Sequence, residues 1–211
     1  YIPSAFMRII SKIDVKNNFV IKGINLEGLR KIGDPLEIAT KYYQDGIDEI
    51  MMIDVVASLY GRNNLFDIIK KTTENIFVPI TLGGGIRSLK DIDEALKSGA
   101  DKVAINTFAT ENPNFIKEAV NNFGSSTITI YIEAKNIGDK KWEAYKNSGR
   151  DKTGLDIIDW IKKVQDFGCG ELLITSVDYE GLQKGFDIQL LNEIYNHINV
   201  PLILNGGCGN I

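Results

Sequence analysis

Short apolar runs alternate along the chain with longer segments in which apolar residues recur every three or four positions. The short runs predict buried β-strands, and the longer segments predict amphipathic helices. Seven strands are expected, at residues 8–14, 49–54, 77–82, 102–106, 127–133, 171–178 and 200–205. The regular alternation of strands and helices indicates βαβ units and a parallel sheet covered by helices. A doubly wound sheet and a (β/α)8 barrel would both produce this pattern.

An internal repeat distinguishes the two architectures. The stretch VPITLGGGIRS at 78–88 returns as VPLILNGGCGN at 200–210, an offset of 122 positions (200 − 78). DEIMMID at 48–54 similarly returns as GELLITS at 170–176. Two similar halves of about four βα units each predict a TIM barrel with a two-fold half-barrel repeat.

One barrel domain is expected over residues 7–211, and residues 1–6 are interpreted as a leader outside the fold. A (β/α)8 barrel needs eight strands, whereas the sequence predicts seven. We therefore expect the eighth βα unit to be absent from this chain, which would leave two strand edges exposed.

In a barrel of this kind the active site is built at the C-terminal ends of the strands. Asp14 and Glu133 end the first and fifth predicted strands, which face each other across a barrel. Opposed carboxylates can divide general acid and general base catalysis on one substrate held between them. The alternative is that each carboxylate only ends its strand, because such residues suit turns.

Glycine turns at 83–85 and 206–207 follow predicted strands at this same end. Glycine lets the backbone approach a ligand closely and direct N–H groups at an anion, so such turns often bind phosphate. Two of them, half a barrel apart, predict a substrate with a phosphate at each end. Asn106 and Thr107 would complete the first site beside Gly85. Tight turns without a ligand are the alternative.

At the opposite end, four predicted strands begin with a charged residue: Arg8, Glu49, Lys102 and Glu171. Two positive and two negative side chains around the mouth of a barrel can form a salt-bridged ring. Composition alone favours the other interpretation, because charges that flank strands are usually solvated.

Composition narrows the possible functions. The 211 residues carry a net charge of −4 with basic residues spread along the chain, which argues against nucleic-acid or acidic-membrane binding. Two cysteines and the single His197 offer neither a zinc site nor a nucleophile system, so no metal or cofactor is expected. Without an apolar run of membrane-spanning length, cytoplasm is the expected localisation.

The alternation in KKWEAY predicts a small hairpin within residues 136–150, carrying Trp142 and Tyr145.

These stretches together resemble the cyclase subunit of imidazole glycerol phosphate synthase, the HisF family of histidine biosynthesis, along residues 7–211. The motifs that carry the resemblance are RIISKIDV, VIKGINLEGLRKIGDP, DEIMMIDVVAS, VPITLGGGIRS, GADKVAIN, SGRDKTG and GELLITSVD. The resemblance implies a lyase barrel that receives ammonia from a partner glutaminase docked on its N-terminal face. The ammonia is joined to a linear bisphosphate, PRFAR, and cyclisation and cleavage release imidazole glycerol phosphate and AICAR.

The resemblance also implies roles for individual residues. Asp14 and Glu133 match the two catalytic acids, and Lys22 matches a substrate-contacting lysine. The two phosphate sites correspond to Gly85, Asn106 and Thr107, and to Gly181, Gly206 and Gly207. Further substrate contacts fall on Asp178, Glu180 and Asn205. The gate through which ammonia enters matches the four charges at the strand starts, Arg8, Glu49, Lys102 and Glu171.

Four positions at the active face depart from the family pattern. Glu133 and Glu180 stand where aspartates are expected, Asn205 replaces a serine, and Lys12 takes a usually small or thiol position. Residues two apart on a strand share a face, so Lys12 is expected to point inward beside Asp14. The extra methylene of Glu133 moves its charge by about 1 Å, a displacement that changes rates where geometry is tight.

The departures keep a second hypothesis open, a relative that transfers ammonia to form amidine groups on a sugar of surface polysaccharide. A third hypothesis is a single-chain phosphoribosyl sugar isomerase, against which the matched gate argues. A fourth is a non-catalytic scaffold for the partner, against which the retained Asp14 and glycine turns argue.

Overall fold

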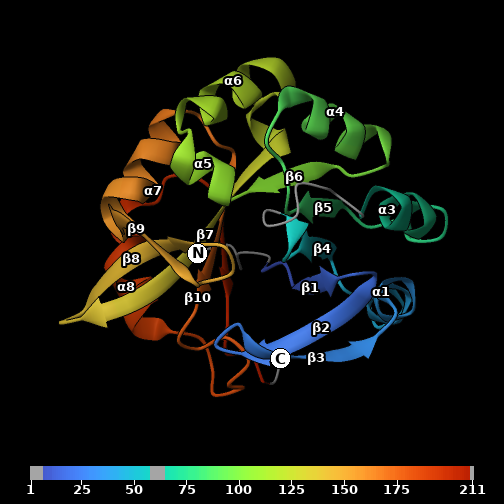
Figure 1. Ribbon diagram of the computed structural model, residues 1–211, viewed down its shortest axis with the longest axis horizontal. Helices are drawn as coiled ribbons and strands as arrows, with labels where there is room; N and C mark the ends of the chain where they lie inside the picture. The colour runs from blue at the N-terminus through green and yellow to red at the C-terminus, as the bar shows by residue number, and fades with distance from the viewer. Residues whose placement is uncertain (1–6, 58–64, 210–211) are drawn as a thin grey trace, which may run out of the picture.

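The computed structural model describes residues 7–57 and 65–209, and these form a curled sheet with helices on its outer side (Figure 1). Seven strands of this sheet are parallel neighbours: Ile10–Lys16 (β1), Glu49–Asp54 (β4), Ile80–Gly83 (β5), Lys102–Ile105 (β6), Ile128–Gly138 (β7), Glu171–Ser176 (β10) and Leu202–Asn205 (β11). The helices between them are Pro35–Gln44 (α1), Leu65–Thr73 (α3), Leu89–Lys97 (α4), Thr107–Glu111 (α5), Asn114–Phe123 (α6), Ile157–Asp166 (α7) and Ile188–Ile194 (α8). The predicted TIM-barrel architecture is therefore confirmed.

The strand boundaries differ from the predicted ones in an explicable way. The strands expected from residues 77 and 200 begin only at Ile80 and Leu202. Pro79 and Pro201 precede these positions, and proline has no N–H to donate to a ladder. The prediction was also too long at the end of β10, which stops at Ser176.

The fifth predicted strand, by contrast, was too short. β7 continues past Glu133 to Gly138 because it forms one arm of a hairpin. The first predicted strand began two residues too early, since Arg8 lies outside β1.

The apolar residues form two layers on either side of the curled sheet. The larger cluster lies between strands and helices and contains the fully buried Ile13, Met52 and Trp160. A smaller cluster fills the inside of the barrel with Met51, Tyr131 and other residues from the alternate strand positions. This two-sided burial is why the parallel strands read as almost continuous apolar runs.

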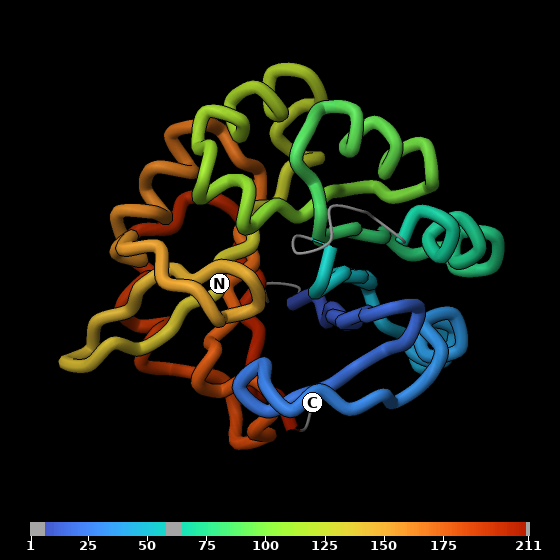
Figure 2. The backbone as a smooth tube through the Cα atoms, viewed as in Figure 1, coloured from blue at the N-terminus to red at the C-terminus, as the bar shows by residue number. Residues whose placement is uncertain are grey.

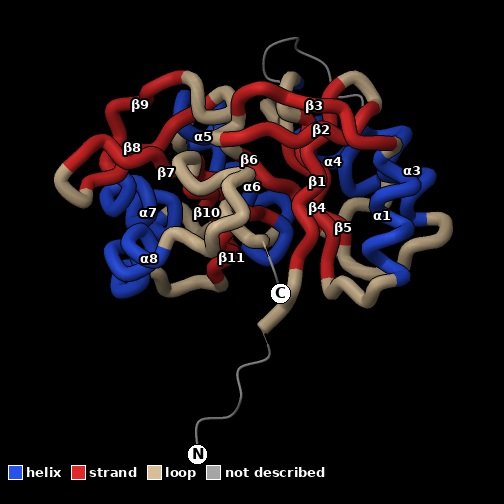
Figure 3. The backbone as a smooth tube through the Cα atoms, turned by 90° about the horizontal axis from the view of Figure 1, so that it is seen from below, coloured by secondary structure: helices blue, strands red, loops and turns tan. Residues whose placement is uncertain are grey.

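Two antiparallel hairpins extend the sheet at one end of the barrel (Figure 3). Phe19–Ile24 (β2) and Glu27–Gly33 (β3) follow β1, while Lys141–Lys146 (β8) and Asp151–Asp156 (β9) follow β7. The sequence predicted the second hairpin and missed the first. β2 and β8 begin 122 residues apart (141 − 19), as do α1 and α7 (157 − 35). The half-barrel repeat therefore includes the hairpins.

The starts of α1 and α7 follow the usual rules of helix capping. Asp34 precedes Pro35 and its carboxylate accepts hydrogen bonds from the N–H groups of Leu36 and Glu37. Asp156 caps α7 in the same way in the second half. These contacts satisfy backbone donors that have no partner within a helix.

The sheet order runs from β11 through β10, β7, β6, β5 and β4 to β1 and its hairpin. In the part of the chain that the structure describes, β11 and β1 do not pair with each other. The absence of an eighth unit stays a prediction.

None of the described helices is long and apolar enough to cross a membrane. Trp142 of the second hairpin packs into the outer apolar cluster, so this side chain anchors the hairpin.

Candidate active site

A cavity of about 480 Å³ opens at the carboxyl ends of the parallel strands. Asp14 on β1 and Glu133 on β7 both line it. Strands β4, β5 and β6 separate β1 from β7 in the sheet, so the curl of the sheet brings the two acids to different walls of one cavity. Two carboxylates in such a position can exchange protons with one substrate.

Lys12 lies inside the barrel beside Asp14, as the strand periodicity predicted. Its Nζ is 2.5 Å from Asp14 Oδ1 and 5.8 Å from the centre of the Tyr131 ring. Both members of the ion pair are buried, with side chains 6% and 8% exposed. Burial lowers the pKa of Lys12, but the charges of Asp14, Glu180 and Glu133 raise it above its usual value. Lys12 is therefore an ammonium ion at working pH.

Glu133 is buried beneath the β8–β9 hairpin. The Gly149 N–H at the tip of that hairpin donates to Glu133 Oε2 at 2.8 Å. Burial raises the pKa of Glu133 to about 7, although the Gly149 N–H and the charge of Lys12 lower it. The side chains of Asn106 and Tyr131 lower it further. Glu133 therefore exchanges a proton near neutral pH, as a general acid–base catalyst must.

The first glycine turn forms another part of the cavity wall. Gly84 and Gly85 have φ values of +91° and +72°, a backbone region that favours glycine, and both line the cavity. Asn106 and Thr107, predicted to share this site, line it too. The Thr107 hydroxyl accepts a hydrogen bond from the Asn147 N–H at 3.3 Å, so the tip of the second hairpin rests on this wall.

The second predicted anion site forms a separate cavity of about 120 Å³. Its lining contains all three glycines of that prediction, Gly181, Gly206 and Gly207, together with three predicted substrate contacts, Lys22, Glu180 and Asn205. Lys22 forms an ion pair with the buried Glu180, which also accepts a hydrogen bond from Asn205 Nδ2 at 3.0 Å. Burial raises the pKa of Glu180, but the charges of Lys12 and Lys22 outweigh burial and lower it. Glu180 is thus an anion that orients Lys22.

Asp178 lies outside the linings of both cavities. Its Oδ2 accepts a hydrogen bond from the Asn136 N–H at 2.7 Å, which ties the loop after β10 to β7. This hydrogen bond gives Asp178 a structural role in place of the predicted substrate contact.

The tip of the first hairpin lies beside the segment that follows β10 (Figure 2). The Asn25 N–H donates to the Glu180 carbonyl oxygen at 2.7 Å, next to the Lys22–Glu180 ion pair. The first hairpin therefore borders the small cavity through Lys22 and the large one through Leu26, and the second hairpin borders the large cavity through Ser148.

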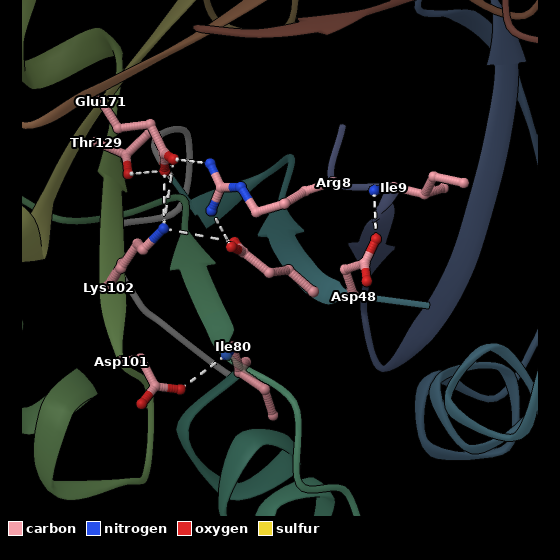
Figure 4. Close-up of polar contacts among 9 residues, drawn as sticks. Arg8, Ile9, Asp48, Ile80, Asp101, Lys102, Thr129 and Glu171 are labelled. Carbon is pink, nitrogen blue, oxygen red and sulfur yellow. Dashed lines mark hydrogen bonds and ion pairs between the residues drawn. The ribbon is translucent and has the colours of Figure 1, made fainter. Parts of the chain in front are cut away.

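A ring of four charged side chains closes the other end of the barrel (Figure 4). Arg8 pairs with Glu49 and, at 2.8 Å, with Glu171. Lys102 Nζ lies 3.4 Å from Glu49 Oε2 and 3.1 Å from Glu171 Oε2. Thr129 adds a hydrogen bond to Glu171 at 3.1 Å. Positive and negative groups alternate around this ring, and the solvated interpretation is wrong for the buried Glu49 and Glu171, while Arg8 remains partly exposed.

Residues 8–211 match the family described as histidine biosynthesis protein. The chain belongs to this family. Imidazole glycerol phosphate synthase subunit HisF of Legionella pneumophila is 48% identical over 205 residues, which cover 97% of this chain and 97% of that relative. The subunit of the same name from Bacillus cereus strain Q1 is 45% identical over 203 residues, covering 96% of this chain and 81% of the relative. The resemblance to HisF is confirmed.

Several residues of this histidine biosynthesis family member line the large cavity without having been predicted. Tyr131 points inward from β7, Arg87 follows the first glycine turn, and Ser148 comes from the tip of the second hairpin. Arg87 could have been predicted as a site residue, because it is a charged residue directly after the glycine turn GGGI. Ser148 could not be found in this way, because only the folded hairpin brings it to the cavity, where its hydroxyl donates to the Val55 carbonyl at 3.2 Å.

Of the remaining sequence candidates, Cys169 is buried and lines neither cavity, whereas the exposed Cys208 lies in the lining of the small one. His197 belongs to a short 3₁₀ turn, Tyr195–His197, and lines neither cavity. Among the described residues, no group of three His, Cys, Asp or Glu side chains could hold a metal ion.

At the first glycine turn, the backbone of Gly84 lies against the backbone of Asp54, and substitution of Gly84 tests this close approach. A Cβ on Gly84 would lie 2.2 Å from the Asp54 carbonyl oxygen, whereas a Cβ on Gly46, which has a similar φ of +87°, would meet nothing within 4 Å. Gly46→Ala is expected to lower the free energy of unfolding by about 1 kcal/mol through backbone strain alone. Gly84→Ala should cost roughly 1 kcal/mol more because it also overpacks. Urea unfolding measures both, and equal losses would contradict the close approach.

Proposed function

We propose that this chain is the cyclase subunit of imidazole glycerol phosphate synthase. In this function it combines ammonia with PRFAR and releases imidazole glycerol phosphate and AICAR. The observation that carries the proposal is the pair of acids, Asp14 and Glu133, on different walls of one cavity that a glycine turn also lines. HisF relatives that are 45% to 48% identical over nearly the whole chain support the same activity.

The two cavities suit a substrate with a phosphate at each end. Gly85, Asn106 and Thr107 would bind one phosphate through backbone N–H groups and polar side chains. Lys22, Gly206 and Gly207 would bind the other. The reacting atoms would then lie between them, within reach of the acids.

The ion-pair ring at the N-terminal end of the strands is proposed as the ammonia entrance. Its alternating charges lie around the mouth of the barrel, and the apolar inner cluster with Met51, Tyr131 and Leu173 separates it from the cavity. A neutral ammonia molecule can pass an apolar layer that excludes ammonium and other ions. The partner would be a glutaminase subunit that docks on this face and forms a heterodimer.

A direct assay tests the activity without the partner. The purified chain is mixed with PRFAR and an ammonium salt at alkaline pH, where free ammonia is abundant, and the loss of PRFAR absorbance is followed. Loss of absorbance together with formation of AICAR is expected. A protein that binds PRFAR and leaves it unchanged over hours would contradict this function.

A second candidate, ammonia transfer to a sugar acceptor in the formation of amidine groups, is favoured by one observation. Lys12, Glu133 and Glu180, which depart from the family pattern, act on one another electrostatically around the acids. A changed charge pattern at the reacting groups is what a different acceptor would require. Turnover of a nucleotide sugar with ammonium, in the absence of PRFAR turnover, would select this candidate.

A further inference from the structure

Lys12 places a positive charge among the acids of the main cavity. Its ammonium contacts Asp14 at 2.5 Å on the same strand. From β7, Glu133 acts on it electrostatically and the Tyr131 ring lies 5.8 Å away. Glu180, from the loop after β10, is a third acid whose charge reaches it. The two acids and the phosphate contacts of the proposed function do not by themselves involve this buried amine.

Other charged groups also line the cavity. They are Asp54 at the end of β4, Arg87 after β5 and Glu111 on α5. None of these belongs to the strands that carry the two acids, whereas Lys12 shares β1 with Asp14.

We infer that Lys12 divides the acid–base work between the two acids: its ammonium keeps Asp14 charged, so that Glu133 carries the exchangeable proton. This inference rests on the proposed function, since it concerns the same two carboxylates. Lys12 is then a positioning residue, which acts through Asp14 and Glu133 and sets the charge of each.

The contacts of the two acids differ in the way this division requires. Protonating Asp14 would leave the buried Lys12 ammonium without its direct partner, which is costly in a site of low polarity. Glu133 instead accepts the Gly149 N–H, a neutral donor, and burial favours its protonated form. Protonation is therefore easier at Glu133.

The proton balance of the proposed reaction is then simple. The nitrogen that ammonia brings loses protons as the new C–N bond forms, and the carbonyl oxygen that it replaces takes up protons and leaves as water as its C–O bond breaks. The amine that leaves in the later cleavage gains a proton as its bond to carbon breaks. Glu133 as the carboxylate accepts the first proton and as the neutral acid returns it, so its charge is restored after each turnover. Asp14 keeps its negative charge throughout and stabilises the positive charge that develops on the substrate.

Carboxyl titration by NMR on the full chain tests the inference. Aspartate and glutamate side-chain carboxyls are labelled with ¹³C, and the two signals are assigned with Asp14→Asn and Glu133→Gln. In the wild-type protein, Glu133 is expected to titrate near pH 7. In Lys12→Met, the Glu133 midpoint should rise by about 1 pH unit or more, because the positive charge that lowers it has been removed.

Matched variants separate the effect of the charge from that of the substitution. Lys97→Met removes an exposed lysine that pairs with Asp93, and it should not move the Glu133 midpoint. Lys12→Arg keeps the positive charge, and it should keep the Glu133 midpoint within about half a unit of the wild-type value. If Lys12→Met does not fold, the wild-type titration and Lys12→Arg still decide the matter.

Activity provides an independent measurement. With free ammonia held constant, the pH midpoint of kcat should move upward in Lys12→Met together with the Glu133 signal. A wild-type protein in which Glu133 stays charged across the pH range of activity would overturn the inference, as would an unchanged Glu133 midpoint in folded Lys12→Met. Absence of PRFAR turnover by the wild-type protein would overturn the proposed function instead, and the titration would still test the role of Lys12.

Discussion

Asp14→Asn is expected to abolish turnover, with a fall in kcat of roughly a thousandfold or more, while affinity for PRFAR changes little. The substitution removes a buried carboxylate from the cavity and leaves the Lys12 ammonium without its partner at 2.5 Å. The predicted phosphate contacts lie elsewhere, at the glycine turns and at Lys22. The carboxylate that acts on the reacting atoms is therefore a different residue from those proposed to bind the phosphates, so rate and affinity can be changed separately.

Steady-state kinetics with PRFAR and ammonium, together with a PRFAR binding isotherm, measure the two quantities for Asp14→Asn. Asp93→Asn is the matched control, because it removes an aspartate that pairs with an exposed lysine, Lys97, far from either cavity lining. Its kcat should equal that of the wild type. If Asp14→Asn loses affinity in proportion to rate, Asp14 is a binding residue and its catalytic assignment is wrong.

Lys102→Met is expected to lower the free energy of unfolding by about 3 kcal/mol. Lys102 contacts both glutamates of the ring, and the side chains of Glu49 and Glu171 are each only 6% exposed. Without Lys102, two buried carboxylates share the single guanidinium of Arg8. An unbalanced charge in such a place is far more costly than a lost surface ion pair.

A double variant distinguishes charge balance from packing. Lys102→Met combined with Glu171→Gln leaves one positive and one negative group, Arg8 and Glu49, and should recover more than half of the lost stability. Lys97→Met, which breaks an exposed pair with Asp93, should leave the free energy of unfolding nearly unchanged. Urea unfolding at pH 7 gives all three values. A double variant no more stable than Lys102→Met would show that the ring is not a charge-balanced unit.

The barrel could be predicted because its two layers of core leave a strong pattern in the sequence. The inner and outer clusters make strands such as β4 apolar on both faces, and the 122-residue repeat then selects a barrel. The first hairpin was missed because β3 is mostly exposed and has little apolar alternation. The first hairpin could still have been inferred from the hairpin predicted at 136–150, because the 122-residue repeat places an equivalent hairpin directly after β1.

The site was predictable where it depends on strand ends and unpredictable where it depends on tertiary closure. Asp14 and Glu133 lie on strands whose direction and spacing follow from the pattern, so their meeting in one cavity could be expected. The Gly149 N–H reaches Glu133 only because the β8–β9 hairpin folds back across the cavity. The ion-pair ring likewise exists only once the curled sheet brings four distant positions together, and composition alone indicated solvated charges.

The two halves of the barrel repeat their backbone and differ in their side chains. β5 ends at Gly83, which offers only backbone, whereas β11 ends at the equivalent Asn205, whose amide donates to Glu180. The cavities beside these strand ends measure about 480 and 120 Å³. A scaffold with true two-fold symmetry would accept an elongated dianion in either direction. Because the two ends of this site differ, we expect a ligand with unlike ends to bind in a single orientation and to present its reacting atoms to Asp14 and Glu133 in a fixed order.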